Sequence, residues 1–247
     1  MDTGHLYYLK EKDITWFNPC YGLMNFWNEY QKLKKKLNKP HDYIWTHRDL
    51  KKAKEIYATS IIAKVMEQQE EVGPWWILKP ENDPPDGVIG TLVEKDGIKK
   101  MHVREIEVVE HLSGETVIDT IKNKLSKKHY EPNTLLVCYV SAGGKYDFKK
   151  LADEISKEIT SLNHIFLVFT GQLISEIPLN VSNEEFARAI IKVSLVQIKP
   201  IYSVTTIDPI GICENWRAGK EGNFFIFEGL GKGDARPITS ENPPKLF

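Results

Sequence analysis

Apolar positions recur every three or four residues in two early segments, and this spacing predicts two amphipathic helices. The first helix carries its apolar stripe on Leu23, Phe26, Trp27, Tyr30, Leu33 and Leu37. It ends at Asn38-Lys39-Pro40, because proline cannot continue a helix. The second helix opens at Thr46, closes at Gly73-Pro74 and has an apolar face made by Leu50, Ala53, Ile56, Tyr57, Ile61 and Val65.

After the second helix, two apolar stretches joined by a turn dipeptide predict a β-hairpin. The apolar stretches Val88 to Val93 and Ile98 to Val109 flank Asp96-Gly97, a dipeptide typical of tight hairpin turns. Side chains alternate between the two faces of a strand, so Glu105 and Glu107 share one face of the second strand. The Ile and Val residues between them favour burial of the other face.

The rest of the chain alternates predicted helices and buried strands. Residues 113–129 and 148–162 predict helices, and the apolar runs at 134–140 and 164–170 predict central strands. With Trp75 opening a first strand, residues 46–170 read helix, strand, strand, strand, helix, strand, helix, strand. This order predicts an α/β fold with a mixed β-sheet flanked by helices. Beyond it, we expect an amphipathic helix at 183–194 and strands at 196–207 and 223–228.

Composition limits the functional classes without choosing among them. The chain has 247 residues and a net charge of −1, so any basic surface for nucleic acid has to be local. Cys20, Cys138 and Cys213 show no paired spacing, which argues against a disulfide framework or a zinc finger. No apolar run approaches membrane-spanning length, and the first residues lack the apolar core of a secretion signal. We therefore expect a soluble cytoplasmic protein without a membrane partner.

Three carboxylates in and near the hairpin are the candidate functional groups. Asp86 stands in the turn Pro85-Asp86-Gly87, before the first hairpin strand, and Glu105 and Glu107 stand on the second. Pairing of the two strands would bring the three side chains near one another. Like charges at that spacing repel unless solvent, a proton or a cation separates them. Since hard divalent cations take carboxylate ligands and retain waters, the pattern predicts a site for Mg²⁺ or Mn²⁺.

These residues resemble a known motif. Pro85-Asp86, followed after a gap by Glu105-Ile106-Glu107, resembles the PD-(D/E)xK nuclease superfamily, and the predicted element order is similar to its αβββαβ core. The resemblance implies a restriction-endonuclease-like fold in which Asp86 and Glu105 bind the metal. Glu107 stands where the family usually has Lys, and would be a third ligand or the base for the attacking water. In a second register Glu107 is the metal-binding acid and Val109 takes the Lys position.

The resemblance also implies supporting residues on two helices. Some nucleases of this superfamily that lack the motif lysine take a basic group from the neighbouring helix, so Lys122 or Lys124 would act on the phosphate or orient the attacking water. Lysines beside an apolar stripe also commonly just extend their ends to solvent, which is the alternative. The helix before the first core strand often carries an acid that faces the metal, here one of Glu67, Glu70 and Glu71.

Together these features give a hypothesis for the whole chain. Residues 1–45 form an aromatic-rich helical N-terminal extension, 46–234 a nuclease-like α/β domain and 235–247 a C-terminal tail. The expected function is metal-dependent hydrolysis of nucleic-acid phosphodiesters, with DNA favoured over RNA. The alternative is a catalytically inactive protein of the same fold that binds nucleic acid or protein. A homodimer formed through the N-terminal helix is compatible with both.

Overall fold

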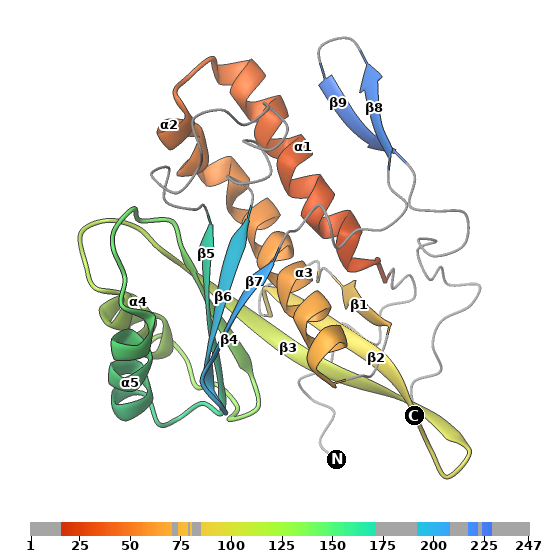
Figure 1. Ribbon diagram of the computed structural model, residues 1–247, viewed down its shortest axis with the longest axis vertical. Coiled ribbons are helices and arrows are strands. Elements are labelled where there is room, and N and C mark those ends of the chain that lie inside the picture. Colours follow the sequence, from red (N-terminus) through yellow and green to blue (C-terminus); the bar gives the residue numbers. More distant parts are fainter. Residues whose placement is uncertain are drawn as a thin grey trace. The chain divides into compact units, whose positions relative to one another are not determined.

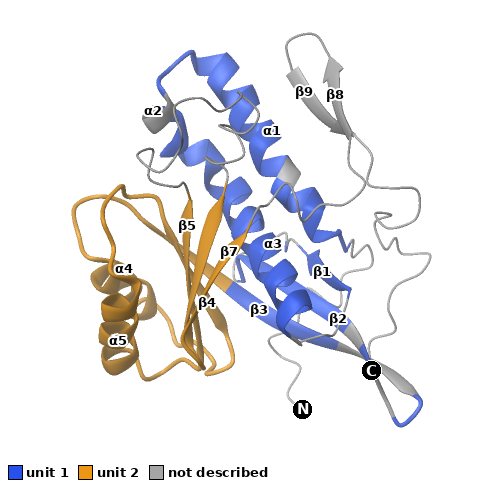
Figure 2. Cartoon of the chain, in the orientation of Figure 1, with its two compact units in different colours: residues 1–106, 214–247 blue, residues 107–213 orange. Residues whose placement is uncertain are grey.

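The computed structural model describes residues 16–70, 74–78, 80, 85–170, 192–207, 217–221 and 224–228. The chain divides into two compact units (Figure 2). Unit 1 comprises Met1–Ile106 and Glu214–Phe247, and unit 2 comprises Glu107–Cys213. The chain passes from the first unit to the second inside one long strand, β3 (Ile98–His111).

Seven strands form one mixed sheet in the order in which they occur along the chain (Figure 1). Strands β1–β2, β2–β3, β5–β6 and β6–β7 pair antiparallel, and β4–β5 pair parallel. The predicted α/β class with a mixed sheet is confirmed. The remaining strands of the sheet are β1 (Trp75–Leu78), β2 (Gly87–Lys95), β4 (Leu135–Val140), β5 (His164–Thr170), β6 (Val193–Lys199) and β7 (Ser203–Ile207), while β8 (Arg217–Glu221) and β9 (Phe224–Glu228) form a separate pair.

Helix α1 (Pro19–Leu37) has well-defined ends that the sequence explains. The Asn18 side chain accepts a hydrogen bond from the Cys20 backbone N–H at 2.9 Å, and proline occupies the first helical position. At the other end Asn38 adopts a left-handed conformation, with φ of 50°, and its N–H donates to the Lys34 carbonyl. The short helix α2 (His41–Trp45) and a 3-10 turn at Arg48–Leu50 then lead into α3.

Helix α3 (Lys51–Glu70) is the central element of unit 1 and packs along α1. It is buried on most of its circumference, since Tyr57, Ala58, Ile61, Ile62 and Val65 are all almost inaccessible. Two glycines let neighbouring elements approach it closely. A Cβ placed on Gly22 of α1 would lie 2.0 Å from Ser60 Oγ, and one on Gly87 of β2 would lie 2.2 Å from Thr59 Oγ1. Only glycine fits at these two contacts.

The hairpin of β2 and β3 forms as its turn signal predicts. Asp96 and Gly97 both have positive φ, 56° and 71°, which is the conformation required by a two-residue turn that matches strand twist. The register pairs Val88 with Glu105 and Gly87 with Ile106. Residues facing each other in an antiparallel pair share a face, so Gly87 and Ile106 lie on the same side of the hairpin.

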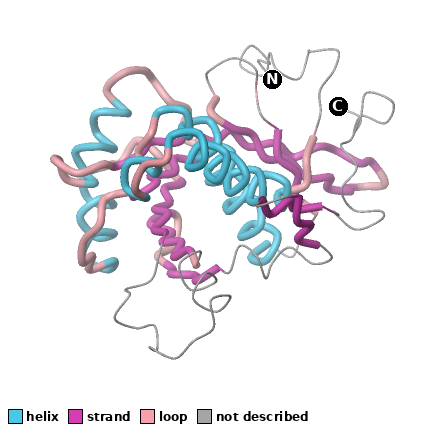
Figure 3. Tube along the Cα trace, turned by 90° about the horizontal axis from the view of Figure 1, so that it is seen from above, coloured by secondary structure: helices cyan, strands magenta, loops and turns pink. Residues whose placement is uncertain are grey.

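In unit 2, helices α4 (Val117–Leu125) and α5 (Phe148–Glu158) pack beside the strands, as the tube view also shows (Figure 3). Thr116 caps α4 by accepting from the Asp119 N–H, and Asp147 caps α5 by accepting from the Lys150 N–H. Their apolar faces close a core with the central strands. Its members include Val117, Ile121, Leu136, Cys138, Val140, Ala152, Ile155, Leu167 and Val196.

Several predicted boundaries are wrong. The expected strand at 196–207 is two strands, β6 and β7, which turn around the cis Lys199-Pro200 peptide bond. Residues 193 and 194, expected to end a helix, begin β6, while 183–191 lie outside the described residues. The caps are also displaced, because α4 begins after Thr116 rather than Ser113 and α3 begins at Lys51 rather than Thr46.

Cysteine pairing departs from the prediction as well. Cys20 is disulfide-bonded, whereas Cys138 is a free thiol buried in the core of unit 2. Sequence spacing misleads here because a disulfide depends on the distance between Cα atoms in the folded chain. Burial raises the pKa of the Cys138 thiol, so this group is an inert packing residue rather than a nucleophile.

Candidate functional site

Asp86 lies on the wall of a cavity inside unit 1. It immediately precedes β2 and is 7% exposed. The cavity has a volume of about 360 Å³, which falls in the range of small-molecule sites. Helices α1 and α3, strand β1 and the start of β2 supply its walls, through Phe17, Tyr21, Asn25, Glu29, Asp49, Lys52, Ile56, Thr59, Ile77, Leu78, Asp86 and Gly87.

The position of Asp86 follows from its neighbour Gly87. The backbone of Gly87 lies against the Thr59 side chain of α3, where any Cβ would overlap the hydroxyl. Thr59 is fixed in turn, since its hydroxyl donates to the Glu55 carbonyl at 2.8 Å. The first residues of β2 are therefore held directly against α3, and Asp86 is held with them.

Glu55 of α3 is a second buried carboxylate in this region, with 3% exposure. Burial and the negative charge of Asp86 both raise the pKa of Glu55. The two nearest cations are Lys52 Nζ, 3.1 Å from Oε2, and Lys51 Nζ, 3.5 Å from Oε1. Both lysines are well exposed, so they relieve the burial of this charge only in part. Glu55 and Asp86 are thus two buried acids of unit 1 that interact electrostatically.

Glu105 belongs to the same unit but faces the other way. It stands one residue before Ile106, which shares the α3 side of the hairpin with Gly87. Alternation along the strand places Glu105 on the opposite face, where its side chain is half-buried. Among the described residues, the cavity wall includes Asp86 and does not include Glu105.

Glu107 lies in unit 2 and is held by two lysines. It is 3% exposed, and its two oxygens contact Lys124 Nζ at 2.9 Å and Lys128 Nζ at 2.5 Å. Lys124 also donates to the Val108 carbonyl, and Lys128 lies 4.6 Å from the centre of the Tyr130 ring. The two ammonium groups balance the negative charge of this buried carboxylate. Lys128 is the residue of this group that the sequence did not single out.

The two lysines of α4 proposed as alternatives behave differently. Lys124 contacts the buried carboxylate of Glu107, and its expected role at a phosphate or an attacking water stays a prediction. Lys122 instead forms an exposed ion pair with Glu158 of α5, and this contact raises the pKa of Lys122. Their different environments follow from their places on the helix, since residues two apart point in different directions.

The prediction that Glu67, Glu70 or Glu71 of α3 faces a metal stays a prediction, and the acid of this helix that interacts with Asp86 is Glu55. Glu67 pairs with Lys64 at 2.5 Å, the side chain of Glu70 is not described and residue 71 lies outside the described residues. The helical period gives no signal for Glu55, which follows Lys54 and lies outside the predicted apolar face of the helix.

The described part of the chain holds no group of three or more His, Cys, Asp or Glu side chains placed to bind one metal ion. It also contains no helix long and apolar enough to cross a membrane.

No family model, curated protein or solved structure matches this chain.

Unit 2 also contains a buried, hydrogen-bonded histidine. His111 is buried, its Nδ1 lies 2.8 Å from Thr120 Oγ1, and that hydroxyl donates to Glu115 Oε1 at 2.8 Å. Burial lowers the pKa of His111, with Glu115 acting against it. The neutral ring is therefore favoured.

Proposed function

We propose that the protein is a metal-dependent hydrolase of nucleic-acid phosphodiesters, with Asp86 as the principal metal ligand. The observation that carries this proposal is the buried pair of Asp86 and Glu55 beside a cavity. Burial and the negative charge of Asp86 raise the pKa of Glu55, and a cation between the two carboxylates would relieve this repulsion. Mg²⁺ is often held by one or two carboxylates and otherwise by waters and phosphate oxygens, so two protein ligands are enough.

The residues present fit such an ion. Both carboxylate oxygens of Glu55 are buried and lack a well-directed hydrogen bond, despite the lysine contacts. Mg²⁺ or Mn²⁺ at this position would polarise a phosphodiester and promote ionisation of a water. Asp86 would bind the metal ion and orient it, and the contact between Thr59 and Gly87 would fix the position of Asp86.

The order of elements supports the same class of protein. Helix α3, the antiparallel strands β1 to β3, helix α4 and strand β4 follow the αβββαβ order of restriction-endonuclease-like nucleases. The roles of Glu105, Glu107 and Lys124 in hydrolysis, the preference for DNA and a homodimer through the N-terminal helix remain predictions.

Cleavage and metal binding by single variants test the proposal. Asp86→Asn preserves volume and removes the charge, so we expect cleavage of plasmid and single-stranded DNA with Mn²⁺ to fall about 100-fold or more. Calorimetry should show a matching loss of Mn²⁺ affinity. Asp153→Asn is the control, because Asp153 is an exposed acid of α5 that pairs with Lys149. Equal activity of the Asp86 and Asp153 variants would refute the assignment.

One observation favours a second candidate, a binding protein without catalytic activity. Lys124 and Lys128 balance the charge of Glu107, so this predicted metal ligand already has two cationic partners. Nucleic-acid binding without cleavage, together with no Mn²⁺ affinity in the wild type, would support this candidate. The Mn²⁺ affinity of the wild type separates the two candidates, because the hydrolase needs the ion and the binding protein does not.

A further inference from the structure

The cavity that holds Asp86 also has a flat aromatic wall. Tyr21 stacks on Phe17, with 4.8 Å between ring centres and 16° between ring planes. Phe17 covers one face of the Tyr21 ring, and Tyr21 remains 41% exposed, so the other face is left to a ligand. Parallel stacking of this kind is what aromatic rings offer to planar groups, including nucleobases.

This aromatic pair is held rigidly within unit 1. Phe17 exchanges two backbone hydrogen bonds with Ile77 of β1, each 2.8 Å long. Tyr21 lies in the first turn of α1, and its N–H donates to the Asn18 carbonyl at 2.9 Å. A stacking surface fixed in this way loses little conformational entropy when a ring binds to it.

The polar groups around the cavity favour a ligand with N–H donors. Glu29 of α1 and Asp49 of the 3-10 turn are acidic residues in the cavity wall. Glu29 contacts Lys32 at 2.8 Å, and Asp49 contacts His47 at 3.7 Å and Arg48 at 3.8 Å. Lys32 and Arg48 offset part of the negative charge beside the cavity. The carboxylate oxygens keep further acceptor capacity.

We propose that this cavity is a nucleobase subsite, where an unpaired base carrying an amino group stacks on Tyr21 and donates to Glu29 or Asp49. The inference rests on the proposed function and deepens it, because it makes single-stranded or locally unpaired nucleic acid the substrate class. A base inside a duplex is stacked on both faces and paired along one edge, so it cannot stack on such a ring. Carboxylates accept from the amino group of cytosine, whereas thymine offers a carbonyl in its place.

Binding without cleavage tests the inference. The probes are fluorescein-labelled oligodeoxycytidylate and oligothymidylate of equal length, titrated with the full chain in EDTA and followed by fluorescence anisotropy. We expect Tyr21→Ala to weaken oligodeoxycytidylate binding roughly tenfold, as for removal of one base–aromatic contact. Tyr21→Phe keeps the ring and should bind within about twofold of the wild type. The wild type should prefer oligodeoxycytidylate to oligothymidylate.

The chain offers a matched control in Tyr43. This tyrosine of α2 is also exposed, at 50%, lies against His47 and is not part of the cavity wall. Tyr43→Ala should leave binding unchanged. An equal loss in the Tyr21→Ala and Tyr43→Ala variants, or a loss in Tyr21→Phe as large as in Tyr21→Ala, would overturn the stacking role. Equal affinities of the wild type for the two oligonucleotides would overturn the roles of Glu29 and Asp49.

Failure of this inference and failure of the proposed function give different results. If the subsite is wrong, Tyr21→Ala binds as the wild type does while Asp86→Asn still loses cleavage. If hydrolysis is wrong, no variant cleaves, yet the dependence of binding on Tyr21 in EDTA persists. Circular dichroism melting of Tyr21→Ala separates lost stacking from lost folding, and Tyr21→Phe tests the ring in a variant that keeps the contact with Phe17.

Discussion

Glu55 and Glu107 are equally buried, at 3% exposure, and each contacts two lysines, but their surroundings differ. In unit 2, Glu107 meets two lysine ammonium groups within 2.9 Å, and its charge is balanced inside the fold. In unit 1, burial and then the charge of Asp86 raise the pKa of Glu55, and the two lysines that contact Glu55 are largely exposed to solvent. A balanced carboxylate contributes to structure, whereas one left with a like charge has unused capacity to bind a cation.

The largest expected effect on stability comes from removing the two lysines that balance the charge of Glu107. The double variant Lys124→Met/Lys128→Met leaves a buried carboxylate without its ion-pair partners, so we expect the free energy of unfolding to fall by about 3 kcal/mol. Urea denaturation followed by circular dichroism measures this. Adding Glu107→Gln to the double variant removes the stranded charge and should restore most of the loss.

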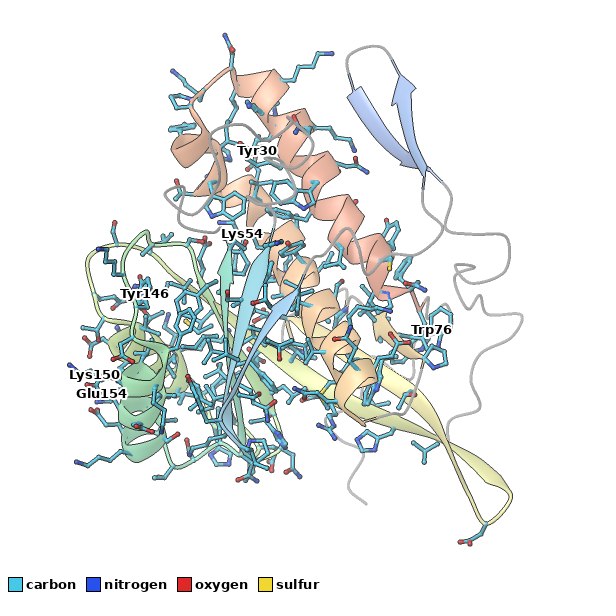
Figure 4. All side chains as sticks on the ribbon, in the orientation of Figure 1. Tyr30, Lys54, Trp76, Tyr146, Lys150 and Glu154 are labelled. Carbon is cyan, nitrogen blue, oxygen red and sulfur yellow. The ribbon has the colours of Figure 1, made fainter. Side chains whose placement is uncertain are left out.

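The control for this variant lies on α5. Lys149 and Lys150 pair with Asp153 and Glu154 at the surface, and Figure 4 shows Lys150 and Glu154 on the outer side of the helix. Replacing both lysines with Met should change the free energy of unfolding by no more than about 0.5 kcal/mol. If the two double variants are equally unstable, charge balance at Glu107 is not the cause.

A smaller and pH-dependent effect is expected at Glu55. Because the pKa of Glu55 is raised in the folded state, the folded protein holds this proton more tightly than the unfolded chain does. The resulting stabilisation is complete below the ordinary value of 4.5 and is lost as the pH rises through the higher folded-state pKa. Glu55→Gln does not titrate, so its advantage over the wild type should appear as the pH rises above 4.5 and reach about 1 kcal/mol at neutral pH.

Urea unfolding of both proteins in EDTA over a pH series measures this difference. Glu67→Gln is the control, since Glu67 lies on the same helix and already pairs with Lys64. A wild type that is more stable than Glu55→Gln at neutral pH would show that Glu55 is balanced after all. Added Mn²⁺ should reverse the order, because a bound cation favours the ionised carboxylate.

The smallest effect is expected at Lys122, the lysine that meets neither buried acid. Its ion pair with Glu158 is exposed to solvent and is screened by salt. Lys122→Met should melt at the same temperature as the wild type and cleave DNA at the same rate. A loss of cleavage that matches the Asp86→Asn variant would show that Lys122, rather than Lys124, serves the reaction.

The elements were predictable where the signal is local. Asp96-Gly97 specified the turn between β2 and β3, and the apolar runs at 134–140 and 164–170 specified two central strands, because both signals depend on neighbouring residues. The split between β6 and β7 was missed, since a continuous apolar pattern does not reveal a turn at Lys199-Pro200.

The candidate site was predictable only in part. The sequence identified Asp86, whose place before a strand is local, and it identified Lys124 as a basic group on α4. It did not identify Glu55, which interacts with Asp86 only in the folded chain, or the stack of Phe17 and Tyr21 on the cavity wall. Tertiary contacts of that kind leave no fixed spacing in the chain.

Gly87 has a consequence for recognising distant relatives of this chain. Its backbone occupies space that a methyl group would need, directly against Thr59. A relative that keeps this cavity should therefore keep an Asp-Gly dipeptide at the opening of a strand, matched by a helix with Glu and Thr four residues apart. That paired signature can be searched for in chains too divergent to align, and it would separate those that retain the acidic pair from those that retain the fold alone.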